Sequence, residues 1–153
     1  MYPNANPFSS VPFGGARIPS NVYRRVGVET SVSTASPHDL VKLLFEGYFE
    51  AVAQAKGGIQ TNDIALKAKG ISKAVAIIDE GLKACLDMKQ GGQLSTNLWN
   101  LYEYVSLRLT QANLKNDLAL LDECVQLITP IRDSWVQISS QANTANVRQE
   151  VAA

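Results

Sequence analysis

The chain has 153 residues, of which 46% are hydrophobic, and its 14 basic side chains equal its 14 acidic ones in number. This length predicts one domain that is long enough to bury a core. The balanced charge argues against a nucleic-acid-binding protein, and no apolar run approaches the roughly 20 residues that cross a bilayer, so membrane insertion is not expected. Residues 1–20 carry one charged side chain, Arg17, among prolines and glycines that interrupt any apolar stretch, which argues against an export signal. Two cysteines are too few for a disulfide framework, so the expected location is cytoplasmic.

The first 35 residues are expected to lie outside the main core. Residues 1–20 are rich in Pro, Gly and Ser, a composition that buries too little apolar surface to fold, so they are predicted to be a disordered extension. Residues 21–35 are interpreted as a capping segment that could dock on the body as a short helix or strand. Its candidate contacts are Tyr23, Val26 and Val28.

Four helices are predicted to follow, at about residues 37–57, 63–89, 94–116 and 118–139. Ser36 is suited to cap the first helix, and Gly57-Gly58 is expected to end it. Asn62 or Asp63 is the expected cap of the second helix. Because the loops between them are short, sequential helices should run antiparallel, which predicts an all-α, up-down four-helix bundle. Residues 140–153 are polar and without periodicity, and are predicted to be a disordered tail.

The second helix carries two apolar stripes where one would suffice for a core. Beside the stripe that contains Ile71, Ile78 and Leu82 runs a second one, made largely of small residues: Leu66, Gly70, Ala74, Ile77, Gly81, Ala84 and Met88. A glycine inside a helix costs about 1 kcal/mol relative to alanine. Two interpretations stay open: the small residues permit tight packing within the bundle, or they line a groove for an apolar segment of a partner or of the chain's own N-terminus.

The third helix shows one ordinary core stripe, whereas the first and fourth also carry more apolar residues than a core face needs. Trp99 and Tyr104 lie off the core stripe of the third helix, either as peripheral packing or as partner contacts. In the fourth helix, Pro130 removes a backbone hydrogen bond. A kink near Gln126, or a helix broken into two parts, is therefore predicted.

The sequence shows no pattern of residues that is typical of a catalytic or metal-binding site. The single histidine, His38, stands at a helix start without the Glu-x-x-His spacing of a di-metal bundle site. Cys85 and Cys124 lie on apolar faces and are interpreted as small core residues. No phosphate-binding or dinucleotide-binding glycine motif occurs. We therefore expect no enzyme activity, no metal and no cofactor.

A series of motifs recurs in one register through the second half of the chain. They are Leu86-Asp87 before Gly91-Gly92, then Asn97-Leu98, Leu101-Tyr102-x-Tyr104, Arg108-Leu109, and Ala112-Asn113 with Asn116-Asp117. Together they resemble the FliS family of flagellar secretion chaperones. Earlier and later segments agree with the same pattern: Tyr23, Val28-Glu29-Thr30, Ala35-Ser36-Pro37, Leu44-Phe45-Glu46-Gly47, and Arg132 with Trp135. The resemblance covers about residues 22–139.

The resemblance implies an antiparallel helical bundle in the bacterial cytosol that binds the disordered C-terminal region of flagellin. It further implies that the chaperone prevents premature polymerisation of flagellin and helps deliver it to the flagellar type III export gate, with the gate and regulatory proteins as further partners. On this basis residues 23–30 are hypothesised to shield a groove until the client replaces them. The alternative from another class is a non-enzymatic helical adaptor or a self-associating structural bundle.

Overall fold

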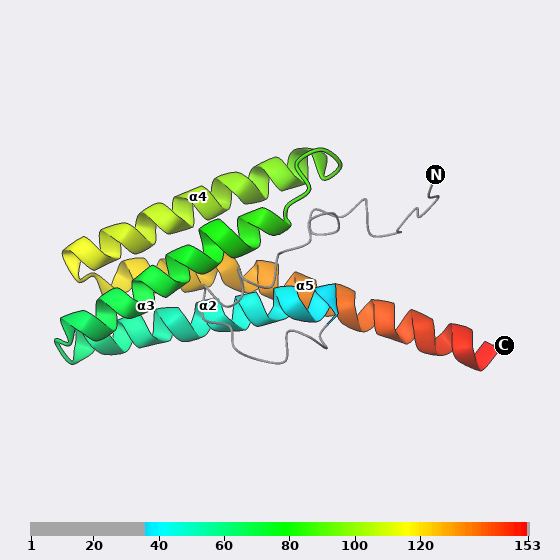
Figure 1. Cartoon of the computed structure of the whole chain (residues 1–153), viewed down its shortest axis with the longest axis horizontal. Helices are drawn as coiled ribbons and strands as arrows, with labels where there is room; N and C mark the ends of the chain where they lie inside the picture. The colour runs from blue at the N-terminus through cyan, green and yellow to red at the C-terminus, as the bar shows by residue number, and fades with distance from the viewer. Residues whose placement is uncertain (1–35, 153) are drawn as a thin grey trace.

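The computed structural model describes residues 36–152, without the side chains of residues 139, 142–147, 149–150 and 152. The predictions for residues 1–35, including Tyr23, Val26 and Val28, lie outside the described residues. The elements are α2 (Pro37–Gln60), α3 (Ile64–Ala76), the π-helical turn η1 (Ile77–Leu82), the 3-10 turn η2 (Lys83–Cys85), α4 (Gly92–Lys115) and α5 (Leu118–Ala152). Consecutive α-helices run in opposite directions (Figure 1), and no strand occurs between residues 36 and 152. The predicted all-α four-helix bundle is confirmed.

Three of the four α-helices begin at a side-chain cap, and two of these caps, Ser36 and Asp63, are predicted from the sequence. Ser36 Oγ accepts a hydrogen bond from the N–H three residues later at 3.2 Å, and an oxygen of Asp63 does the same at the start of α3 at 3.0 Å. Asp117 Oδ1 accepts from the N–H two residues later at 2.9 Å. α4 ends where Asn116 takes a left-handed conformation with φ 51°. The caps therefore fix the turns that bring sequential helices side by side.

Three boundary predictions are wrong. Gly57-Gly58 does not end α2, which continues to Gln60 because both glycines adopt ordinary helical geometry and the turn is made at Asn62, with φ 56°. The second helix ends at Cys85 rather than near residue 89, after the π-helical and 3-10 turns. Residues 140–152 of the predicted tail are instead the end of α5, which extends beyond the other helices (Figure 1), because residues 139–152 contain no glycine or proline to stop it.

α5 also passes through Pro130 without being divided into two helices. Proline removes one backbone donor, so a single hydrogen bond is lost in a helix of 35 residues. The preceding Thr129 donates its hydroxyl to the Val125 carbonyl oxygen at 2.6 Å within the same turn. The predicted break is therefore wrong, while the predicted kink stays a prediction.

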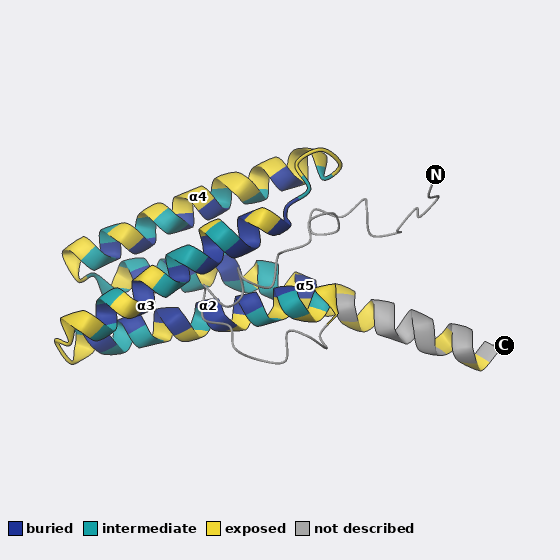
Figure 2. Cartoon of the chain, in the orientation of Figure 1, coloured by how far each residue is buried: buried dark blue, intermediate teal, exposed yellow. Residues whose placement is uncertain are grey.

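One hydrophobic core joins the four helices, and the buried residues face the bundle interior (Figure 2). Its largest fully buried side chains include Tyr48, Tyr102, Phe45, Leu44, Ile77, Ile78, Leu82, Leu109, Leu121 and Ile128. The Tyr48 hydroxyl donates to the Cys124 carbonyl oxygen at 2.9 Å and so links α2 to α5. The bundle is thus held mainly by apolar burial, with a few buried polar links between helices.

Candidate functional site

The small-residue stripe of the second helix lies inside the bundle. Gly70, Ala74, Ile77 and Gly81 are all buried. A Cβ atom at position 70 would lie 2.6 Å from Ala51 O and 2.6 Å from Ala55 N, both backbone atoms of α2. The interpretation of these four residues as an exposed client groove is wrong for this structure, because all four are buried, and the absence of a side chain at Gly70 lets the α3 and α2 backbones approach closely.

The ends of the same stripe are not part of that packing. Leu66 is half-buried near the start of α3, whereas Ala84 in η2 and Met88 in the following loop are exposed. A Cβ atom on Gly81 would meet the Leu44 side chain at 3.1 Å, so the change from buried to exposed comes between Gly81 and Ala84. Only this last part of the predicted stripe is available to a partner.

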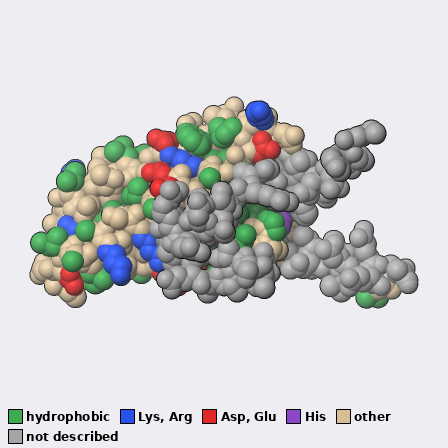
Figure 3. All heavy atoms as spheres, in the orientation of Figure 1, with side chains coloured by type: hydrophobic (Ala, Val, Ile, Leu, Met, Phe, Trp, Pro, Cys, Tyr) green, Lys and Arg blue, Asp and Glu red, His purple; other side chains and the backbone are tan. Residues whose placement is uncertain are grey.

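The exposed apolar side chains concentrate on α4 instead. Of the ten large hydrophobic side chains exposed among the described residues, six lie on α4 or in the loop before it. We call them the α4 surface: Met88, Leu94, Trp99, Tyr104, Leu107 and Leu114. Figure 2 shows the outer side of α4 as mostly exposed, and Figure 3 shows hydrophobic side chains over this helix.

Four of the six side chains of the α4 surface share the outer side of the helix, whereas Met88 precedes the helix and Leu94 lies about 140° around it from Leu107. Leu107 and Leu114, which are 55% and 79% exposed, stand seven residues apart, or about two helical turns. At 100° per residue, both point away from the core side of α4, and Trp99 and Tyr104 flank them on opposite sides. The sequence predicts one ordinary core stripe for this helix, yet five of the ten large hydrophobic side chains that are exposed among the described residues lie on it.

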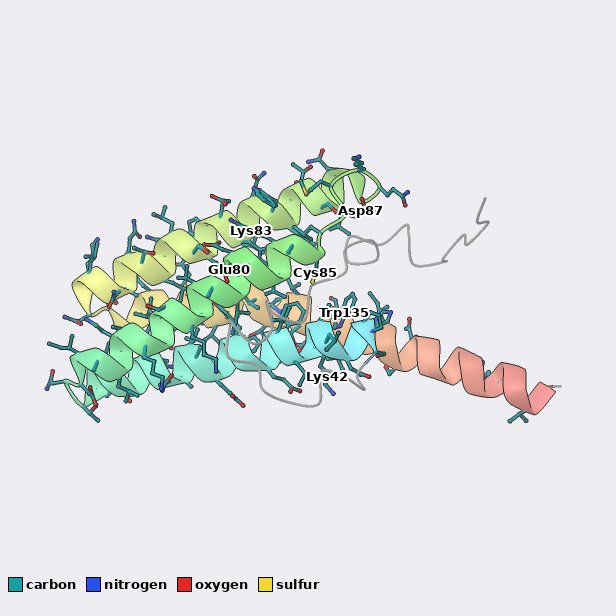
Figure 4. The ribbon with its side chains drawn as sticks, in the orientation of Figure 1. Lys42, Glu80, Lys83, Cys85, Asp87 and Trp135 are labelled. Atoms are coloured by element: carbon teal, nitrogen blue, oxygen red, sulfur yellow. The ribbon has the colours of Figure 1, made fainter. Side chains whose placement is uncertain are left out.

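A buried lysine supports the Trp99 side of this surface. Lys83 is 8% exposed, and its ammonium bonds Glu103, lies 3.2 Å from Asp79 Oδ1, and sits 4.9 Å from the centre of the Trp99 ring. Figure 4 shows Lys83 between α3 and α4. Burial lowers the pKa of Lys83, but the hydrogen bonds and charges of Glu103 and Asp79 outweigh it and raise the pKa above its usual value.

Tyr104, at the other edge of the α4 surface, is likewise held by charged side chains, which lie on α4 and α5. The Tyr104 hydroxyl donates to Glu123 and accepts from Arg108 Nε at 2.8 Å. The guanidinium of Arg108 also lies 5.2 Å from the centre of the Tyr104 ring and 3.4 Å from Glu123 Oε1. Sequence reasoning finds both aromatic residues but misses their partners, which are charged side chains that only the packing of helices brings together.

The remaining reactive side chains serve packing. The indole of Trp135 donates to the His38 carbonyl oxygen at 3.1 Å, and the two rings stack at 4.7 Å. Burial raises the pKa of the Cys85 thiol to about 12 and that of the Cys124 thiol likewise, so both are protonated and unreactive near neutral pH. Among residues 36–152 no cluster of three or more His, Cys, Asp or Glu side chains could hold a metal ion, and no helix is long and apolar enough to span a membrane. The arrangement is suited to binding another polypeptide through the α4 surface.

Comparison with known proteins gives a consistent result. The family described as "Flagellar protein FliS" matches residues 19–142. The flagellar secretion chaperone FliS of Salmonella typhimurium is 44% identical over 121 residues, which cover 79% of this chain and 90% of that protein. The flagellar secretion chaperone FliSB of Pseudomonas aeruginosa is 44% identical over 76% of this chain and 92% of its own length. The corresponding Bacillus subtilis protein is 33% identical, over 71% and 80%.

Proposed function

Because the chain belongs to the FliS family, we propose that it is a cytoplasmic flagellar secretion chaperone that binds the C-terminal region of flagellin. By holding that region, it would prevent premature polymerisation and present flagellin to the type III export apparatus. The observation that carries this proposal is the concentration of exposed apolar side chains on α4 in a chain that matches named secretion chaperones over most of its length.

The α4 surface fits an amphipathic client helix. Leu107 and Leu114 are about two turns apart, so they match apolar side chains that recur every three or four residues on a partner helix. Trp99 and Tyr104 are residue types enriched at the centres of protein interfaces. A client segment that is disordered when free would fold against this face and bury the apolar side chains of both partners.

The other residues predicted to contact a partner are less central to this proposal. Met88 belongs to the α4 surface, Ala84 is exposed in η2 shortly before it, and Leu66 lies farther away near the start of α3. Gly70, Ala74, Ile77 and Gly81 act through helix packing and not through contact with the client. Residues 23–30 remain the hypothesised shield of the client surface.

Calorimetric titration of the full chain with the C-terminal region of the host's flagellin tests the proposal. A one-to-one isotherm with a negative heat-capacity change is expected, because binding buries apolar surface. A peptide of the same composition in scrambled order is the control and should produce no binding heat. Absence of binding across temperatures, with the bundle shown folded by circular dichroism, would refute flagellin as the client. If light scattering also showed a stable oligomer, the self-associating adaptor would replace the chaperone.

A further inference from the structure

We propose that Lys83 is a positioning residue for client binding, whose ammonium fixes the Trp99 ring on the α4 surface before the client arrives. The effect on the client rests on the proposed function. The fixing of Trp99 is a property of the free chain and can be measured without any client.

Lys83 occupies an unusual place for a lysine. It is 8% exposed, whereas its partners Asp79 and Glu103 have side chains that are 42% and 58% exposed. An ammonium has three donor hydrogens, and here two carboxylates and one ring face surround it. Asp79 is itself held by the hydroxyl of Ser106 on α4 at 2.8 Å. The ammonium is therefore constrained from both η1 and α4, and the ring beside it shares that constraint.

The π-helical turn accounts for this position. In a regular α-helix Lys83 would point about 120° away from Ile71, a residue of α3 that faces the core. Residues of a π-helix each advance by a smaller angle, because its hydrogen bonds span five residues. The turn at Ile77–Leu82 therefore rotates Lys83 back toward the bundle, where it reaches α4. The apolar periodicity of the sequence is that of a continuous α-helix, so this rotation cannot be predicted from it.

The Lys83 ammonium restricts the orientation of the Trp99 ring, which is partly exposed. An indole that is 38% exposed on a helix surface would otherwise sample several rotamers, and binding a client would have to select one of them. A cation at 4.9 Å from the ring centre favours one orientation. An anchor that is ordered before binding loses less entropy when the client binds. Tyr104, ordered by Arg108 and Glu123, shows that the second exposed aromatic residue of α4 is held in the same manner.

The test uses Lys83→Met in the full chain, since methionine keeps the length of the side chain and removes its charge. Acrylamide quenching and time-resolved anisotropy of tryptophan fluorescence report the mobility of Trp99, and Trp99→Phe defines the signal of the buried Trp135. We expect Lys83→Met to increase both the quenching and the fast motion of Trp99. Lys69→Met, at an exposed position of α3, is the matched control and should change neither.

Client affinity supplies the second readout. Lys83→Met should weaken binding of the flagellin C-terminal region about three- to tenfold, the range expected for a partly desolvated cation–π contact. In a Trp99→Leu background the same substitution should cause no further loss, because the residue that it positions is gone.

Unchanged quenching and anisotropy in Lys83→Met would overturn the proposal, whatever the client does. An equal loss of affinity with and without Trp99 would also overturn it, because Lys83 would then act by another route. If the wild-type chain does not bind flagellin, the proposed function fails, while the fluorescence still decides whether Lys83 fixes Trp99. Should Lys83→Met not fold, Glu103→Gln removes one of the groups that hold the ammonium and must shift the fluorescence in the same direction.

Discussion

Replacement of Gly70 by alanine distinguishes the two interpretations of the small-residue stripe. A Cβ atom there would lie 2.6 Å from Ala51 O, 2.6 Å from Ala55 N and 3.0 Å from Ala55 Cα. All three are backbone atoms of α2, so no side chain can rotate away, and the two helices must separate. Gly57→Ala is the matched control, because a Cβ atom at that helical position meets nothing within 4 Å.

The expected change in the free energy of unfolding is the difference between a steric cost and a gain in helix propensity. Overpacking a core costs about 1–3 kcal/mol, and a clash with backbone belongs at the upper end of that range. Alanine regains about 1 kcal/mol of helix propensity relative to glycine. Gly70→Ala should therefore lower the free energy of unfolding by about 2 kcal/mol, whereas Gly57→Ala should raise it by about 0.5–1 kcal/mol.

Thermal and urea unfolding followed by circular dichroism measure both effects. For a domain of this size, the melting temperature should fall by about 4–8 °C in Gly70→Ala and rise by a few degrees in Gly57→Ala. A Gly70→Ala variant as stable as Gly57→Ala would refute the close approach of α2 and α3. The stripe would then have to face outward, and the groove interpretation would return.

Three further predictions concern buried polar groups. Tyr48→Phe should cost about 1 kcal/mol in urea unfolding, because its hydroxyl bonds a carbonyl oxygen, whereas Tyr102→Phe should be neutral or stabilising, since its buried hydroxyl has no hydrogen-bond partner among the described residues. The raised pKa values of Cys85 and Cys124 mean that the unfolded chain loses these protons first as pH rises. Stability should therefore fall from about pH 8.5 upward, by about 1.4 kcal/mol per pH unit for each thiol, and Cys→Ser variants should reduce this slope in pH-dependent unfolding. Lys67→Met should destabilise the fold by about 2 kcal/mol in the same assay, because the Lys67 ammonium donates two hydrogen bonds, at 2.9 and 2.6 Å, to the C-terminal end of α4.

The sequence predicts the bundle well because its main determinants are local. Ser36, Asp63 and Asp117 cap their helices through hydrogen bonds that span two or three residues, and such spacing is visible in the sequence. The apolar periodicity that defines four helices is local as well. Glycine is less reliable as a signal that a helix ends, since Gly57 and Gly70 both lie within helices. Whether a glycine allows close packing depends on which helix lies beside it.

The candidate surface depends on contacts between helices and is harder to predict. Lys67 and Lys83 are buried because a carbonyl or carboxylate group of another helix receives each ammonium, and neither contact is visible in the sequence. Trp99 and Tyr104 are found from their positions off the core stripe, but their ordering by cations is not visible before the helices are assembled.

Binding of the flagellin C-terminal region to the α4 surface can be tested by the affinity of a double variant. Leu107→Asp with Leu114→Asp introduces charge at the two most exposed side chains of this surface, whereas Ile64→Asp makes the same kind of change at an apolar side chain that is 75% exposed elsewhere. All variants should remain folded, because these side chains are exposed. We predict that the double variant loses more than about tenfold in affinity, and that Ile64→Asp binds as the wild type does. A folded double variant with wild-type affinity would place the client on another face of the bundle.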